Sequence, residues 1–326
     1  MELLSEPGNR QVIFVLGPAY CGSTLLNYQF DALPGVLGLS EAINWFRDPP
    51  VAMCLGCKTA MQRCRNFERY RLAPDFYERW FADNPEITTL VNTSKVAVLC
   101  WYKMPKPPEG VTSRVLLLTK QPHEFAWSMI QHERAGLISS GTVSEALDRW
   151  AEICMSTYEI VRLTAEGKPT KKAWSAPPLT LDSIKSLTYR DIVTDPAAAL
   201  QPICQAWGIT FDAEGVRNPW GRKSTTCAVG GNFAAASQVL GNFKETVGRK
   251  DYLDGKYEGQ EGKLFLDRAW TRNVEFLRLC LELYASNGRS SLAATVAENF
   301  GHPPRDRLIG EVTEAYRVAL ELQRQA

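Results

Sequence analysis

Residues able to bind an anion are concentrated in one short segment near the start of the chain. Val12 to Leu16 form an apolar run that predicts a buried strand, and a turn from Gly17 to Gly22 leads into a helix beginning at Ser23. Free backbone N–H groups and the positive end of the helix dipole converge at such a turn, which can therefore hold a phosphate or a sulfate. Ser23 and Thr24 add hydroxyl donors. The turn contains no lysine or arginine, so a balancing positive charge has to come from another segment.

The glycine spacing invites comparison with the triphosphate-binding pattern G-x-x-x-x-G-K-[ST]. Gly17 and Gly22 have the spacing of that pattern, but Ser23 stands where the lysine is required. Without this lysine a kinase or GTPase loses its contact to the β- and γ-phosphates. No apolar strand ending in aspartate offers a clear magnesium ligand either. A P-loop-type kinase therefore stays an alternative, as does a tight turn with only a structural role.

Three further strands, each followed by a helix, are predicted downstream at residues 89–92, 115–118 and 184–189. In the first of these units, Thr93 or Ser94 is expected to cap the following helix. Strands that alternate with helices favour right-handed crossovers and a parallel sheet covered by helices on both faces. The sequence thus predicts an α/β fold with a parallel β-sheet.

The chain is expected to form a single domain over residues 1–326. Its nucleotide-binding core spans about residues 12–210, and a loop-rich and helical C-terminal part spans about residues 211–326. No linker of convincing length separates the two parts. Residues 47–66, which contain Pro49 and Pro50, are expected to be irregular.

Composition argues against several classes of partner. The 37 basic and 36 acidic side chains leave a net charge of +1, which gives no support for a nucleic acid or an anionic membrane. The N-terminus lacks the pattern of a signal peptide, and no stretch is long and apolar enough to span a membrane. We therefore expect a cytoplasmic protein.

Nine cysteines are spread along the chain, and Cys54, Cys57 and Cys64 form their only cluster. A structural zinc site needs four ligands, and no fourth ligand is close in sequence. Reduced thiols and no metal are the expectation, with zinc or a disulfide left open for this cluster.

Four ordered segments resemble those of the PAPS-dependent sulfotransferases, especially the bacterial branch. PAPS is 3′-phosphoadenosine 5′-phosphosulfate. The segments are the glycine turn with Gly22-Ser23-Thr24-Leu25-Leu26, then Asn92-Thr93-Ser94-Lys95, then Thr119-Lys120-Gln121-Pro122 with Ser128, and Tyr189-Arg190-Asp191 with Asp195-Pro196. Gly230-Gly231-Asn232 and Asp267-Arg268-Ala269-Trp270 resemble two later family motifs. The resemblance covers about residues 12–285 and implies the P-loop NTPase-like fold of these enzymes.

The resemblance implies PAPS as cofactor, with no metal required, and assigns residues to its parts. The loop residues Tyr20, Cys21, Gly22, Ser23 and Thr24 would bind the 5′-phosphosulfate, and Lys120 and Ser128 would bind the 3′-phosphate. Tyr189, Gly231 and Asn232 complete the implied cofactor-binding set. The acceptor would be a hydroxyl or amine of a small molecule, a lipid or a carbohydrate.

Two residues are the candidates for catalysis. Lys95 would balance the charge of the transferring sulfonate, and Glu41 would act as the general base, with His123 and His132 as alternatives. Tyr20 stands where the family usually has a basic residue, and Lys120 replaces the usual arginine. A non-catalytic nucleotide-binding or scaffold relative is therefore a further alternative.

Overall fold

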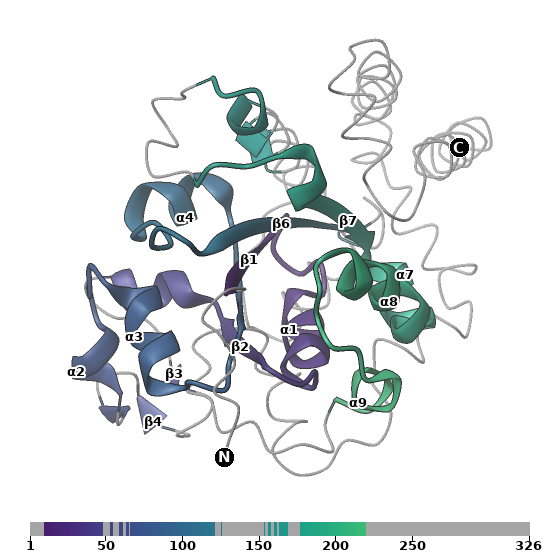
Figure 1. Ribbon diagram of the computed structural model, residues 1–326, viewed down its shortest axis with the longest axis horizontal. Coiled ribbons are helices and arrows are strands. Elements are labelled where there is room, and N and C mark those ends of the chain that lie inside the picture. The colour runs from purple at the N-terminus through teal and green to yellow at the C-terminus, as the bar shows by residue number, and fades with distance from the viewer. Residues whose placement is uncertain are drawn as a thin grey trace, which may run out of the picture.

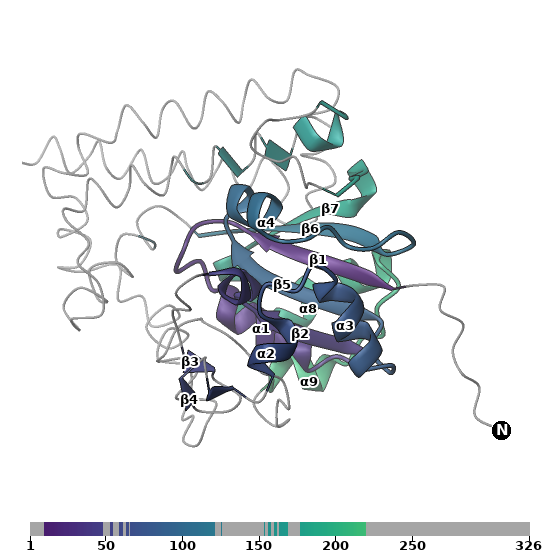
Figure 2. The ribbon, with the colours of Figure 1, turned by 90° about the vertical axis from the view of Figure 1, so that its left-hand side faces the viewer.

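Five parallel strands form the central sheet in a computed structural model of the chain (Figure 1). The structure describes residues 10–47, nearly all of 63–120 and 177–219, and isolated positions between 53 and 60 and between 125 and 168. The strands are β1 (Gln11–Leu16), β2 (Val36–Ser40), β5 (Thr89–Lys95), β6 (Thr112–Thr119) and β7 (Ile184–Thr188). Their order across the sheet is β2-β5-β1-β6-β7, as Figure 2 shows.

Helices cover both faces of this sheet (Figure 1). One face carries α1 (Ser23–Asp31), α7 (Tyr189–Thr194), α8 (Pro196–Ala206) and α9 (Ala213–Arg217). The other carries the 3₁₀ helix η1 (Ala42–Phe46), α2 (Phe67–Tyr70), α3 (Phe76–Asp83) and α4 (Ala97–Lys103). A short 3₁₀ turn, η3 (Leu181–Ser183), precedes β7. The predicted parallel α/β fold is therefore confirmed.

The central strand β1 shows why these strands are apolar along their whole length. Val12, Phe14 and Leu16 belong to the core on the α3 and α4 side. Ile13 and Val15 belong to the core on the α1 and α8 side. Successive strand residues point to opposite faces, so a sheet covered on both faces needs apolar side chains at every position.

The structure corrects the predicted capping of α4. β5 continues to Lys95, and α4 begins at Ala97 after Val96, so Thr93 and Ser94 are strand residues and cap no helix. Tertiary contacts are the reason, because the Ser94 hydroxyl accepts a hydrogen bond from the backbone N–H of Ile43 at 2.9 Å. The hydroxyl that favoured a cap is thus engaged by another element.

Two other predicted boundaries also differ. Tyr189 was expected to end a strand, but it is the first residue of α7. Thr188 and Asp191 form a reciprocal capping box, which starts the helix at that point. In the segment expected to be irregular, β3 (Met53–Cys54) and β4 (Thr59–Ala60) pair as a short antiparallel ribbon. The expected single domain stays a prediction, since residues 220–326 lie outside the described part.

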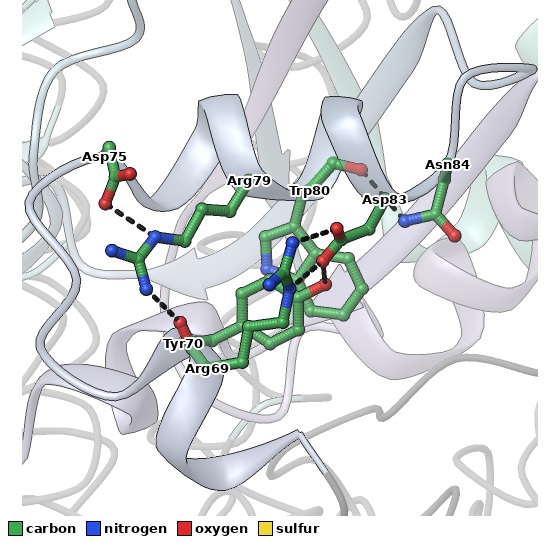
Figure 3. Close-up of polar contacts among 7 residues, drawn as sticks. All are labelled: Arg69, Tyr70, Asp75, Arg79, Trp80, Asp83 and Asn84. Atoms are coloured by element: carbon green, nitrogen blue, oxygen red, sulfur yellow. Dashed lines mark hydrogen bonds and ion pairs between the residues drawn. The ribbon is translucent and has the colours of Figure 1, made fainter.

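Charged and aromatic side chains join α2 to α3 (Figure 3). Arg69 forms an ion pair with Asp83, and the Tyr70 hydroxyl donates to the same carboxylate. The Tyr70 ring stacks on Trp80 with 4.0 Å between ring centroids and meets Trp45 of η1 edge-on at 5.7 Å. The α2–α3 unit therefore supports η1, the helix that directly follows Glu41.

The Arg69–Asp83 contact predicts a pH-dependent stability. Hydrogen bonding from Arg69 holds the pKa of the Asp83 carboxyl below its usual value in the folded protein. A lowered folded-state pKa gives stability above the unfolded value of about 3.9, and this stability is lost as the pH falls through the folded-state pKa. We expect the melting temperature to decline less steeply in Asp83→Asn than in the wild type between about pH 5 and pH 3. The control is Glu86→Gln, which changes an exposed carboxylate. Equal declines of the melting temperature in Asp83→Asn and in the wild type would contradict this assignment.

Candidate active site

The carboxyl ends of all five parallel strands meet at one edge of the sheet, and most of the predicted site residues lie there. The loop from Gly17 to Gly22 follows β1, and Glu41 follows β2. Lys95 ends β5, Lys120 follows β6, and Tyr189 follows β7. In open parallel sheets, ligands bind at this edge. The fold therefore gathers segments that are far apart in the sequence.

Two glycines set the path of the loop after β1. A Cβ atom at Gly17 would overlap the carbonyl oxygen of Leu118, and one at Gly22 would overlap the ring of Tyr189. Gly22 is the N-cap of α1 in the left-handed conformation, with φ 94°. It has no side chain to cap the helix, and the first turn of α1 contains no acidic residue. The positive end of the helix thus faces the loop, as an anion site requires.

Ser23 and Thr24 form the first turn of α1 and are almost fully buried. Their position at the start of the helix places two hydroxyl-bearing residues beside the loop.

The two predicted catalytic residues form an ion pair. The Lys95 ammonium contacts Oε1 of Glu41, although the two residues are 54 positions apart in the sequence. Their side chains are 15% and 23% exposed, so the pair is partly shielded from water. The side-chain amide of Asn44 donates to the other carboxylate oxygen, Oε2, at 3.3 Å. Glu41 is therefore held by a neighbouring strand and by its own helix.

Backbone strain is concentrated at this edge. Tyr20, Ser40 and Lys95 have φ values of 59°, 54° and 71°, and Leu72 is the other non-glycine residue with positive φ in the described part of the chain. Such conformations cost about 1–3 kcal/mol each and cluster at functional sites. Three strained residues thus lie in the segments that carry Glu41, Lys95 and the loop.

Lys95 occupies the centre of a tight γ-turn. The Val96 N–H donates to the Ser94 carbonyl at 2.8 Å, two residues back, while Lys95 has positive φ. The γ-turn with positive φ is the rare and strained form. The Lys95 carbonyl accepts from the N–H of Gly17 at 2.8 Å, which joins this turn to the entrance of the loop.

A second lysine, Lys120, follows β6, the strand on the other side of β1 from β5. Lys120 is 6% exposed, and its ammonium lies 4.1 Å from the centroid of the Tyr189 ring. The same ammonium donates to the backbone carbonyl of Tyr20 at 3.4 Å. A cation above an aromatic face gains electrostatic stabilisation that offsets part of the cost of burial. Lys120 is therefore held between the loop and α7.

The side chains inside the loop carry no charge near neutral pH. Burial raises the pKa of the Tyr20 phenol, and the negative charge of Glu41 raises it further. Burial also raises the pKa of the Cys21 thiol, while the ammonium groups of Lys95 and Lys120 act in the opposite direction. Both lysines thus act electrostatically on the same loop residue. The positive charge that the loop lacks is supplied by Lys95 at the end of β5 and by Lys120 after β6.

Other predicted site residues lie outside the described part of the chain: Ser128, Gly231, Asn232, His123 and His132. The same holds for Cys57. Cys21, Cys64, Cys100 and Cys204 are buried free thiols. Among the described residues, no group of three or more His, Cys, Asp or Glu side chains could hold a metal ion. No described helix has the length and apolarity needed to cross a bilayer.

Sequence reasoning assigned no role to two contributors to the site. Asn44 binds Glu41 directly, and Asn92, three residues before Lys95 on β5, is a fully buried amide within a strand. A buried asparagine in an apolar strand is an available sequence signal, because an amide inside a core needs specific hydrogen-bond partners. Its partners became visible only in three dimensions.

Solved structures that are similar to this chain include sulfotransferases. The sulfotransferase domain of the curacin biosynthetic pathway has a TM-score of 0.47 and 14% identity, over 75% of this chain and 98% of that domain. The sulfotransferase domain of the Synechococcus PCC 7002 olefin synthase has a TM-score of 0.45 and 15% identity, over 76% of this chain and 92% of that domain. Mouse sulfotransferase SULT7A1, complexed with PAP (adenosine 3′,5′-bisphosphate), has a TM-score of 0.38 and 14% identity, over 91% of this chain and 93% of that protein.

No protein-family model and no curated protein sequence matches the chain.

Proposed function

We propose that this protein is a PAPS-dependent sulfotransferase that transfers a sulfuryl group to a hydroxyl or amine of an acceptor. One observation carries the proposal: Lys95 and Lys120 approach the glycine loop from separate strands, and Lys95 is paired with Glu41. A triphosphate-binding loop carries its lysine within the loop itself. Here the charges flank the loop, which suits an anion with negative groups at two separate positions.

The residues at this edge fit such a ligand. The backbone around Gly22, with Ser23 and Thr24, would hold the 5′-phosphosulfate at the positive end of α1. Lys120 would hold the 3′-phosphate, supported by the ring of Tyr189. The proposed cofactor-binding set is completed by five further residues: Tyr20, Cys21, Ser128, Gly231 and Asn232.

PAPS, when bound, supplies an activated sulfuryl group for in-line displacement by an acceptor oxygen or nitrogen. In this proposal Glu41 takes the proton that the acceptor loses. The Lys95 ammonium balances negative charge as it develops beside it. Its pairing with Glu41 keeps both groups at the same edge of the sheet. Two lysines supply the positive charge, so the proposal requires no metal.

The acceptor class is proposed to be a small molecule, a lipid or a carbohydrate, in a cytoplasmic setting. A kinase would bind ATP with magnesium and transfer a phosphoryl group, whereas a scaffold relative would bind nucleotide without turnover. Calorimetric titrations with adenosine 3′,5′-bisphosphate (PAP) and with ATP and magnesium separate the sulfotransferase from the kinase, and an assay of sulfuryl transfer from PAPS separates it from the scaffold relative. Failure of PAP to bind at millimolar concentration would overturn the proposal.

Lys120→Ala tests the proposed 3′-phosphate contact. We expect PAP affinity to fall by about tenfold to a hundredfold, because a charge-assisted hydrogen bond contributes about 1.5–3 kcal/mol. Lys106→Ala, which removes an exposed lysine, is the matched control and should bind like the wild type. Unchanged affinity in Lys120→Ala would remove Lys120 from this role.

A further inference from the structure

We infer that Asn92 and Ser94 are positioning residues that hold Lys95 against Glu41. The inference extends the proposed function by naming residues that act through the Lys95–Glu41 pair rather than on a ligand. Both residues precede Lys95 on β5, and they are 0% and 6% exposed.

The Ser94 hydroxyl links two elements. It accepts the backbone N–H of Ile43 at 2.9 Å, and it also contacts Oδ1 of Asn92. Ile43 belongs to η1, whose N-cap is Glu41. One buried hydroxyl therefore fixes the end of β5 to the helix that presents the carboxylate.

The side-chain amide of Asn92 holds Ser94 in place. Its Oδ1 accepts the backbone N–H of Ser94 at 3.0 Å, and its Nδ2 donates to the hydroxyl of Tyr77 on α3 at 3.2 Å. Nδ2 also lies 3.3 Å from Sδ of Met104, directly after α4. The amide is thereby held from two helices. A fully satisfied buried network of this kind has one preferred geometry.

The strained turn at Lys95 explains why such a network is needed. A lysine with φ 71° persists only where the surrounding structure determines its conformation. Hydrogen bonds to Asn92 hold the residue before Lys95, and the Gly17 N–H holds the Lys95 carbonyl. Without the Ser94 hydroxyl, η1 and the γ-turn lose the buried hydrogen bond that joins them, and the two charges lose their fixed separation.

A double-mutant cycle of Glu41→Gln and Lys95→Met, measured by chemical unfolding, tests the inference without any nucleotide. In the wild-type background we expect the pair to couple by a factor of about two to five in the unfolding equilibrium constant. In a Ser94→Ala background the factor should fall to about one. Ser94→Thr, which retains the hydroxyl, should restore it. Ser94→Cys, whose thiol is a weak hydrogen-bond partner, replaces the alanine variant if that variant does not fold.

The matched control is Thr89→Val, at the opposite end of the same strand. Thr89 is 1% exposed, and its hydroxyl accepts a hydrogen bond from Gln11 at 3.1 Å. Its loss should lower overall stability and leave the coupling of Glu41 and Lys95 intact. Coupling that survives in Ser94→Ala, or that disappears equally in Thr89→Val, would overturn the inference. Failure of PAP to bind would overturn the proposed function and leave this result unaffected.

Discussion

Glu41→Gln is expected to lower the rate of sulfuryl transfer by about 10²- to 10⁴-fold, because a general base contributes acceleration of that order. The same variant should bind PAP at least as tightly as the wild type, and about three- to tenfold more tightly at low salt. In the wild-type structure Glu41 neutralises the Lys95 ammonium, and its removal leaves that charge available to an anion. Steady-state kinetics with PAPS and calorimetry with PAP measure the two effects.

The combination of lost turnover and retained binding distinguishes a base from a structural glutamate. Glu86→Gln, which changes an exposed glutamate, is the matched control and should match the wild type in both assays. Retained turnover in Glu41→Gln would rule out Glu41 as the base and would direct attention to His123 and His132.

Lys95→Met should lower turnover by about 10²- to 10³-fold, the usual effect of removing one preorganised group that stabilises developing charge. The affinity for PAP should fall by less than about tenfold, since PAP lacks the sulfonate that Lys95 would face. The expected signature is a fall in kcat with a small change in PAP affinity, measured by single-turnover kinetics and calorimetry.

Lys103→Met is the matched control, because Lys103 is an exposed lysine at the end of α4. It keeps the same change of side chain and charge at a distance from the loop. Equal losses of turnover in Lys95→Met and Lys103→Met would mean that net charge, rather than the position of Lys95, determines the rate.

The elements with continuous apolar runs could be predicted from the sequence. Val12 to Leu16 form a strand because both faces of the sheet are covered, and Ser23 begins α1 after the left-handed Gly22. The start of α8 was equally predictable, because Asp195 caps it and Pro196 occupies its first turn. These features depend on local chemistry, which a short window of sequence contains.

The boundary at Ser94 could not be predicted in the same way. A serine before a helical pattern favours a cap, yet the Ser94 hydroxyl binds Ile43, which is 51 residues away in the sequence. The boundary at Tyr189 differs, because Thr188 and Asp191 have the spacing of a capping box, a local signal that the apolar run before Tyr189 outweighed in the prediction. A distant hydrogen bond therefore decided the first boundary, and a local one decided the second.

For the candidate site, the available groups can be read from the sequence: a glycine loop without a basic residue, two lysines at strand ends and one glutamate after a strand. The pairing of Lys95 with Glu41, and the place of Lys120 between the ring of Tyr189 and the loop, arise only in the folded chain. Strand order and register depend on packing across the whole sheet, and they determine which strand ends become neighbours.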